Sequence, residues 1–357
     1  MIPKQGIEQP AVVPVHLAPA RRQARWRLAL GVLMTGGILA LAFFNRAWLL
    51  EAIGLARAAQ PAWLLLGLLT IASSFLISSQ VFQVALRALG QRVGVLRLWA
   101  TAVVAIVTSQ VFPAGGVGSY AFLLQSLQRR GIGAGEAALV ATLESLSYAA
   151  AMLILAVFGL AYLASRILAA DPNGSSLLAP VLAAGIAALL IGGVVLLLTR
   201  SAGTLTHWLL RAHRLLARTL HWPHDATWVD HTVAEITRVR ALVAERRRMI
   251  GLLVLIQLTA LSGHSLGLYI ILRSLGTSTS YLTVLSAFGI ALLTSTVNVL
   301  PGGGGTVEAA LVAVLTQLGV GAEAVPAAIL FRLLNFWLLL PIAAGCYAWL
   351  MHDRPSR

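Results

Sequence analysis

Residues 281–318, YLTVLSAFGIALLTSTVNVLPGGGGTVEAALVAVLTQL, contain two short apolar stretches separated by a proline and four consecutive glycines. Neither stretch has the roughly 20 apolar residues that a helix needs to cross a bilayer. Residues 98–128 show the same arrangement around the sequence PAGGVG, which begins at Pro113. We therefore predict two helical hairpins, each interrupted in the middle, that are re-entrant or tightly broken.

The two broken regions align with each other without a gap, at a common offset of 188 residues (301 − 113 = 188). The matched pairs are Thr108 with Thr296, Pro113 with Pro301, Gly115 with Gly303, Gly116 with Gly304, Gly131 with Gly319, Gly133 with Gly321 and Ala134 with Ala322. A ladder of proline and glycine matches over about twenty residues predicts an internal repeat.

The rest of the chain has the composition of a membrane protein. Hydrophobic residues make up 59% and charged residues 11%, whereas soluble domains have roughly 25% charged residues. Six apolar runs reach or approach the length of a span: 28–44, 62–86, 136–163, 177–199, 249–272 and 325–350. We predict an all-α, polytopic integral membrane protein with about six full spans and the two hairpins.

Three of these spans separate the two hairpins. Because an odd number of crossings lies between them, the second hairpin enters from the opposite face, and the predicted repeat is inverted. Inverted repeats built on broken helices are typical of transporters, whose substrate site lies near the middle of the membrane.

Positive charge sets the predicted orientation. The formal net charge of +14 would suggest nucleic acid binding in a soluble protein, but here the arginines lie mostly between apolar runs. The positive-inside rule then places both termini on the cytoplasmic side of the membrane. The predicted domains are a tail over 1–25, a first half over 26–199, a basic loop over 200–248, a second half over 249–350 and a tail over 351–357.

The basic loop contains an amphipathic pattern. Leu205, Trp208 and Leu209 recur at helical spacing opposite three arginines, Arg211, Arg214 and Arg218. This favours a helix lying on an anionic lipid surface, and a solvated helix without lipid specificity is the alternative. We predict a second, polar helix over residues 226–248.

Few ionisable residues fall inside the apolar runs, so each is a candidate for function. Glu144 and Arg332 share the repeat offset and have opposite charges, which predicts an ion pair whose arginine is available to a lipid phosphate, with a static bridge as the alternative. Glu308 begins a predicted helix, where it either caps free N–H groups or acts as a gate. His264 either titrates or packs.

Asn298 and Asn335 are further candidates, for hydrogen bonds to a head group or to the broken backbone. The interruptions leave backbone groups that need a hydrated or protein-lined cavity, and their glycines either expose N–H groups to a ligand or allow close helix packing. The motif residues are Pro113, Gly115, Gly116, Gly118, Pro301, Gly302, Gly303, Gly304 and Gly305.

Other classes of site lack their patterns in the sequence. Histidines of the basic loop match no standard zinc spacing, and we find no nucleophile elbow, P-loop or HExxH motif. We expect no metal, no cofactor and no enzyme activity.

The motifs resemble those of the lysylphosphatidylglycerol synthase transmembrane region, also called the flippase-like UPF0104 membrane family, over roughly residues 25–350. NVLPGGGGTVEAALVAVLTQLGV and AAILFRLLNFWLLLP resemble the family's Pro-Gly-Gly-x-Gly-x-x-Glu element and its arginine-bearing last span. VFPAGGVGSYAFLLQSLQRRGI and AALVATLESLSYAA resemble its first element, with Arg129, Arg130 and Glu144 in matching places.

Two departures from the family pattern limit what the resemblance carries over. Many members have Gly-Glu-x-x-Arg where this chain has Gly118-Ser119-Tyr120-Ala121-Phe122, and the arginine that commonly follows the Glu144 position is Ser145. Roles assigned to the missing pair are therefore not transferred.

The resemblance implies a transporter or flippase that moves a lipid with a polar or anionic head group between the leaflets of a bacterial inner membrane. The substrate classes that it implies are phospholipid, glycolipid, hopanoid and polyprenyl-linked lipid. Arg129 and Arg130 would attract head groups at the cytoplasmic mouth. The alternative is an accessory subunit that presents lipid to a separate transferase, such as a partner glycosyltransferase or lipid-modifying enzyme. We expect no nucleic acid partner.

Overall fold

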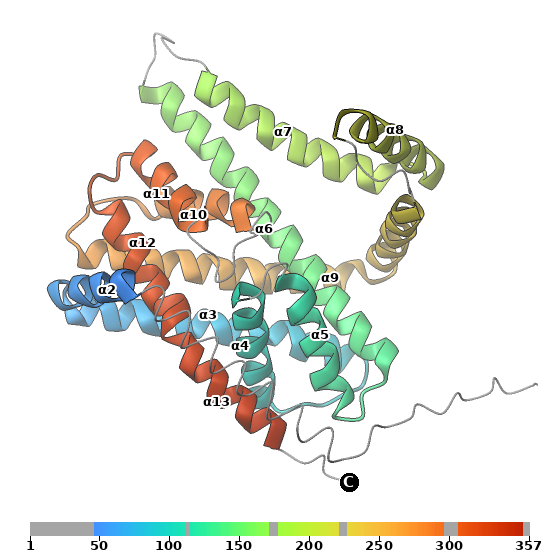
Figure 1. Ribbon diagram of the computed structural model, residues 1–357, viewed down its shortest axis with the longest axis horizontal. Coiled ribbons are helices and arrows are strands. Elements are labelled where there is room, and N and C mark those ends of the chain that lie inside the picture. Colours follow the sequence, from blue (N-terminus) through green and yellow to red (C-terminus); the bar gives the residue numbers. More distant parts are fainter. Residues whose placement is uncertain (1–45, 112–114, 171–177, 221–226, 296–305, 353–357) are drawn as a thin grey trace, which may run out of the picture. The chain divides into compact units, whose positions relative to one another are not determined.

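The computed structural model describes residues 46–111, 115–170, 178–220, 227–295 and 306–352, which form helices joined by short connections, with no strand among them. The helices shown in Figure 1 are α2 (Arg46–Ala58), α3 (Pro61–Ala88), α4 (Val95–Val111), α5 (Gly115–Gln128), α6 (Ala134–Ala170), α7 (Leu178–Thr199), α8 (Ala202–Leu220), α9 (Thr227–Ser274), α10 (Tyr281–Ser295), α11 (Thr306–Gln317), α12 (Ala324–Arg332), the π-helix η2 (Leu333–Trp337) and α13 (Leu339–His352). The predicted all-α class is confirmed for this part of the chain.

Five helical stretches are long and apolar enough to cross a membrane: Pro61–Ala88, Ala134–Ala170, Ala179–Leu197, Thr232–Ser274 and Ala324–His352. They match five of the six predicted spans, and the sixth, 28–44, lies outside the described residues. Large apolar side chains remain exposed on them, with Leu189 at 76% and Leu65 at 57%. Exposed apolar surface of this extent is typical of contact with lipid.

Each predicted broken region forms two short helices that pack against each other, α4 against α5 and α10 against α11. The connecting residues 112–114 and 296–305 lie outside the described part, and with them Pro113, Asn298 and the Pro301–Gly305 motif. Where α4 and α10 end, hydroxyls donate to backbone carbonyls 2.7 Å away, Ser109 to Ile106 and Thr294 to Ala291. These bonds give the two hydroxyls an acceptor inside apolar helices, where no water is present to pair with them.

Helices at the predicted repeat positions end in the same turn. Gly131 after α5 and Gly319 after α11, which the offset of 188 pairs, have φ of 80° and 86°. Glycine adopts this left-handed conformation without a steric penalty. In the first turn the N–H groups of Gly131 and Ile132 donate to the carbonyls of Gln128 and Leu127. In the second turn Gly319 and Val320 donate to Thr316 and Leu315, which are the positions 188 residues later. Helices α3 and α9 end in a similar turn at Gly90 and Gly276.

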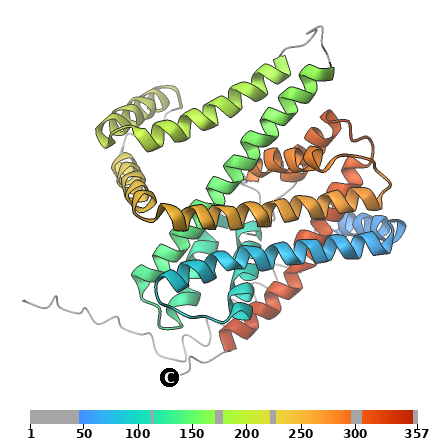
Figure 2. The ribbon, with the colours of Figure 1, turned by 180° about the vertical axis from the view of Figure 1, so that it is seen from behind.

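The packing of the helices also has counterparts. Helix α3 lies along α9 in both Figure 1 and Figure 2. Helix α4 packs against α13, and α10 packs against α6. The offset of 188 residues relates α4 to α10 and α6 to the α12–α13 segment. Under this relation the α4–α13 contact in one repeat corresponds to the α10–α6 contact in the other.

The α6–α10 contact depends on two glycines. A Cβ on Gly159 would lie 2.5 Å from the Ser286 carbonyl oxygen, and a Cβ on Gly289 would meet the Leu155 carbonyl. Because these neighbours are backbone atoms, we expect Gly289→Val to destabilise the protein by roughly 1–3 kcal/mol. Thermal unfolding in detergent checks this, with Gly185→Val on α7, where a Cβ meets nothing within 4 Å, as the control. Equal melting temperatures for the two variants would contradict it.

The loop between the halves forms the two expected helices. Helix α8 covers the amphipathic segment, and the second helix is the first part of α9, which bends at Arg246 before its apolar part begins. The apolar contact between them joins Leu205, Leu209 and Leu210 to Val229, Val233 and Ile236. Protein therefore covers part of the face that the sequence assigned to lipid, while Trp208 on α8 remains 42% exposed.

Candidate functional site

A cavity of about 730 Å³ lies between helices of both halves of the chain. Its walls come from α3, α4, α5, α6, α9, α10, α11, α12 and η2. The cavity is lined by five residues that the sequence predicted as functional candidates: Glu144, His264, Glu308, Arg332 and Asn335. Residues from distant parts of the sequence thus converge on one space within the apolar helices.

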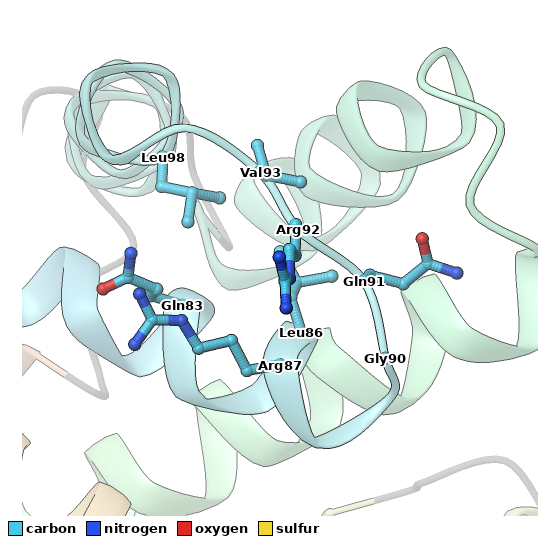
Figure 3. Close-up of a pocket in the computed structure, with 8 residues that line it drawn as sticks. All are labelled: Gln83, Leu86, Arg87, Gly90, Gln91, Arg92, Val93 and Leu98. Atoms are coloured by element: carbon cyan, nitrogen blue, oxygen red, sulfur yellow. The ribbon is translucent and has the colours of Figure 1, made fainter.

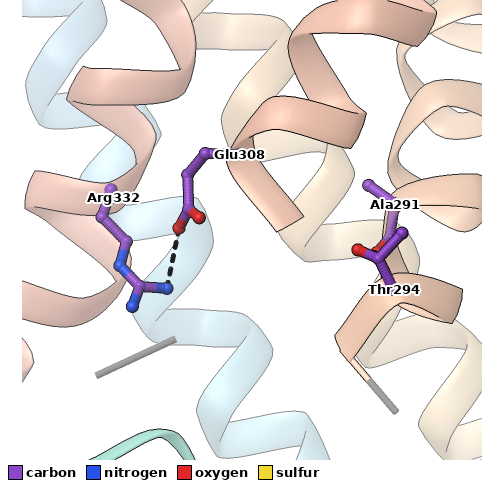
Figure 4. Close-up of polar contacts among 4 residues, drawn as sticks. All are labelled: Ala291, Thr294, Glu308 and Arg332. Atoms are coloured by element: carbon purple, nitrogen blue, oxygen red, sulfur yellow. Dashed lines mark hydrogen bonds and ion pairs between the residues drawn. The ribbon is translucent and has the colours of Figure 1, made fainter. Parts of the chain in front are cut away.

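Arg332 and Glu308 form an ion pair in this cavity. Arg332 is the last residue of α12, Glu308 lies in the first turn of α11, and Nη1 and Oε1 are 2.9 Å apart. Figure 4 shows the two side chains pointing toward each other from their helices. Their side chains are only 14% and 20% exposed, so the pair is largely removed from solvent. Glu308 therefore contacts another helix, whereas the sequence also allowed a simple helix cap.

The π-helix η2 begins directly after Arg332. Pro341 cannot donate a hydrogen bond, and in an α-helix its ring would clash with the carbonyl four residues earlier, at Trp337. The helix changes to a π-helical turn just before that point, where the Leu338 N–H donates to the Leu333 carbonyl, five residues earlier, at 2.9 Å. Phe336 in this turn lies under the guanidinium group of Arg332, 4.3 Å from the ring centre. This cation–π contact holds Arg332 toward the cavity.

Glu144 lines the cavity from α6 and is half-buried. Its carboxylate accepts a hydrogen bond from Ser145 Oγ at 3.3 Å. The repeat predicted an ion pair between Arg332 and Glu144. In the structure Arg332 pairs with Glu308 instead. The two carboxylates thus occupy different settings in one cavity.

His264 and Asn335 have contrasting surroundings. The His264 ring is buried, its Nδ1 lies 2.9 Å from the Ala260 carbonyl, and it packs edge-on against Phe75. These contacts agree with the interpretation of His264 as a packing residue. The Oδ1 atom of Asn335 is buried and has no hydrogen-bond partner among the described residues.

Sequence reasoning missed several polar residues of the cavity. Gln110 on α4 and Gln257 on α9 line it together with Ser78, Tyr120 and Tyr148. Gln257 accepts a hydrogen bond from Ser78 Oγ at 3.4 Å. The available signal was a glutamine inside an otherwise apolar run, which marks a buried polar group but not the space that it faces.

Arg129 and Arg130 do not line the cavity. They lie in the turn after α5, half-buried, and the Arg129 guanidinium donates to the sulfur of Met351 on α13. The glycines Gly115 and Gly116 begin α5, and Gly118 faces α4, where a Cβ would lie 3.4 Å from Thr108 Cγ2. This proximity agrees with the interpretation of close helix packing for Gly118.

A second pocket, of about 570 Å³, lies at the turn between α3 and α4. Figure 3 shows two arginines and two glutamines around its apolar residues. The residues that line it are Gln83, Leu86, Arg87, Gly90, Gln91, Arg92, Val93 and Leu98. Both arginines are exposed, so this pocket concentrates positive charge outside the main cavity.

The chain is similar to known membrane proteins. A family model described as "Lysylphosphatidylglycerol synthase TM region" matches residues 25–343. A protein of Methanothermobacter thermautotrophicus named "UPF0104 membrane protein" is 29% identical over 108 residues, which are 29% of this chain and 32% of the relative. The match therefore spans about a third of the length of that relative.

Proposed function

Because the chain belongs to the lysylphosphatidylglycerol synthase transmembrane-region family, as its motifs predict, we propose that it moves a lipid with a polar or anionic head group between the leaflets of a bacterial inner membrane. The observation that carries this proposal is the cavity of about 730 Å³. It is lined by Glu144 and Arg332, on helical stretches long and apolar enough to span, and by Glu308 on the shorter apolar helix α11. Ionisable groups are costly at that depth and usually mark a transport pathway.

The proposed transport uses an inverted repeat. The equivalent turns at Gly131 and Gly319 support a repeat, as do the reciprocal contacts of α4 with α13 and of α10 with α6. Three apolar helical stretches lie between the α4–α5 pair and the α10–α11 pair. If each pair enters and leaves the membrane on one side, this odd number of crossings supports entry of the two pairs from opposite sides of the membrane. Alternating access then follows from movement of one half against the other around the cavity.

In this proposal the short helix pairs are re-entrant hairpins that bound the cavity, and the Arg332–Glu308 pair acts as its gate. The arginines at the α3–α4 turn and on α8 face the cytoplasm, where anionic lipid attracts them. The protein performs no chemical step on the lipid and requires no cofactor. A separate transferase would act on the lipid before or after transport.

Reconstitution into liposomes tests the proposal. Liposomes that contain the purified chain are loaded with fluorescent phospholipids or glycolipids, and a membrane-impermeant quencher reports the fraction of label that reaches the outer leaflet. We expect exchange of at least one lipid class to exceed the rate in protein-free liposomes. Equal rates with every class would favour the accessory-subunit alternative and reject transport.

A further inference from the structure

The polar groups of the cavity are mostly uncharged. Three carboxamides line it, Gln110 from α4, Gln257 from α9 and Asn335 from η2, together with serine and tyrosine hydroxyls from several helices. Carboxamides and hydroxyls both donate and accept hydrogen bonds. The cavity therefore offers a hydrogen-bonding surface distributed over several helices rather than a single charged contact.

Each of the three carboxamides has an atom without a hydrogen-bond partner in the part of the chain that the structure describes. Gln257 is only 1% exposed, and its Nε2 is buried and unpaired, although its Oε1 is paired with Ser78. Among the described residues, Gln110 Oε1, Asn335 Oδ1 and the second carboxylate oxygen of Glu308 are also buried and unpaired. An unsatisfied buried polar atom costs about 1–3 kcal/mol, so four such atoms on residues that line one cavity favour rotation of their side chains toward a hydrogen-bonding molecule in it.

The charges of the cavity do not favour an anion. Arg332 is engaged by Glu308 at 2.9 Å, which neutralises that pair, and Glu144 adds a carboxylate on the α6 side. A phosphate in the cavity would approach Glu144 and compete with Glu308 for the guanidinium group. The exposed arginines Arg87 and Arg92 lie instead in the separate pocket at the α3–α4 turn (Figure 3).

We infer that the head group accommodated by this cavity is uncharged and rich in hydroxyls, that is, a sugar or polyol attached to a lipid. This inference rests on the proposed lipid transport and narrows its substrate class. Hydroxyls donate and accept, so a polyol pairs with the amide nitrogen of Gln257 and with the oxygens of Gln110, Asn335 and Glu308 once these side chains turn toward the cavity. The cavity volume of about 730 Å³ lies within the roughly 300–1,000 Å³ of small-molecule sites.

A binding competition tests the inference without requiring transport. The full-length protein in detergent is incubated with an equimolar mixture of glucosyl-diacylglycerol, phosphatidylglycerol and phosphatidylethanolamine with identical acyl chains, and native mass spectrometry measures the retained lipids. We expect the glucosyl lipid to be retained roughly tenfold over each of the others, which corresponds to one or two net hydrogen bonds. Equal retention, or preference for the anionic or amine lipid, would overturn the inference.

Variants locate the preference in the cavity. Gln257→Leu should reduce retention of the glucosyl lipid about tenfold while retention of phosphatidylglycerol stays the same, because leucine removes the hydrogen bonds and keeps a similar volume. Gln83→Leu removes a half-buried carboxamide from the second pocket and is the matched control. Gln110→Leu provides the same test if Gln257→Leu does not fold. An unchanged preference in the folded variant would also overturn the inference.

The outcomes separate this inference from the proposed function. Selective binding of the glucosyl lipid without leaflet exchange in liposomes would reject transport and keep the head-group assignment. Leaflet exchange of phosphatidylglycerol together with selective retention of that lipid would keep transport and reject the assignment.

Discussion

Replacing Arg332 with methionine should destabilise the folded protein by about 3–5 kcal/mol, because it leaves Glu308 buried without its counter-charge. The two groups are 2.9 Å apart and mostly removed from solvent, and the second oxygen of Glu308 already lacks a hydrogen-bond partner among the described residues. The variant also loses the cation–π contact with Phe336. Thermal unfolding of the detergent-purified protein measures the change.

The double variant Glu308→Gln/Arg332→Met is the matched control, because it removes both charges and leaves no unpaired carboxylate. We expect it to recover most of the lost stability, since a buried pair is often no more stabilising than uncharged residues of similar size. If the single and double variants unfold at the same temperature, the ion pair has little energetic weight and this account of it is wrong.

Leaflet exchange in the double variant distinguishes a static bridge from a gate. A bridge that only holds α11 to α12 is dispensable once the double variant is stable, and exchange would then continue at the wild-type rate. In our proposal the pair opens and closes during transport, so exchange should fall at least about tenfold although the protein is folded.

Glu144→Gln should lower leaflet exchange at least about tenfold and leave thermal stability nearly unchanged. Glutamine has the shape of glutamate and accepts the hydrogen bond from Ser145, but it neither carries a charge nor takes up a proton. Since Glu144 lines the cavity and is only half-buried, removal of its charge does not leave an unpaired partner in the core.

Glu136→Gln provides the comparison for this prediction. Glu136 lies in the first turn of the same helix, is also half-buried, and accepts a hydrogen bond from Gln91 at 3.3 Å, but it does not line the cavity. We expect this variant to exchange lipid at the wild-type rate. Equal exchange by the two variants, whether high or low, would remove Glu144 from the transport mechanism.

Much of the fold follows from sequence because its signals are strong. Length and apolarity identify the spans, and a proline with clustered glycines identifies the interruptions after α4 and α10. The repeat offset also predicted that Gly131 and Gly319 are equivalent, and both adopt the same positive φ. The glycine that ends a helix is a local requirement of the backbone, so it is visible in sequence.

The contacts of the cavity were harder to predict. Equivalent positions in a repeat are related by symmetry, but they touch only if they lie at the symmetry axis, and so the equivalence of Glu144 and Arg332 did not identify the partner of Arg332. Glu308 is that partner because α11 and α12 pack together. Gln257 was missed because a single polar residue in an apolar span carries no periodicity that reveals which cavity it faces.

The basic loop illustrates the same difficulty. An amphipathic pattern indicates that one face of α8 packs against an apolar surface, but both lipid and other helices provide such a surface. The structure places Val229 and Val233 of α9 against Leu205. Whether lipid or protein contacts that face depends on tertiary packing, which the sequence pattern of a single helix does not reveal.

Leaflet exchange measured before and after the cavity is blocked shows whether lipid passes through the cavity. The chain has one cysteine, Cys346, so a Cys346→Ser background allows a single reactive thiol to be introduced by Ser145→Cys at an exposed position of the cavity wall. We predict that this variant exchanges lipid in liposomes until a bulky thiol reagent is attached, and that exchange then falls to the protein-free rate. Undiminished exchange by fully labelled protein would contradict transport through this cavity.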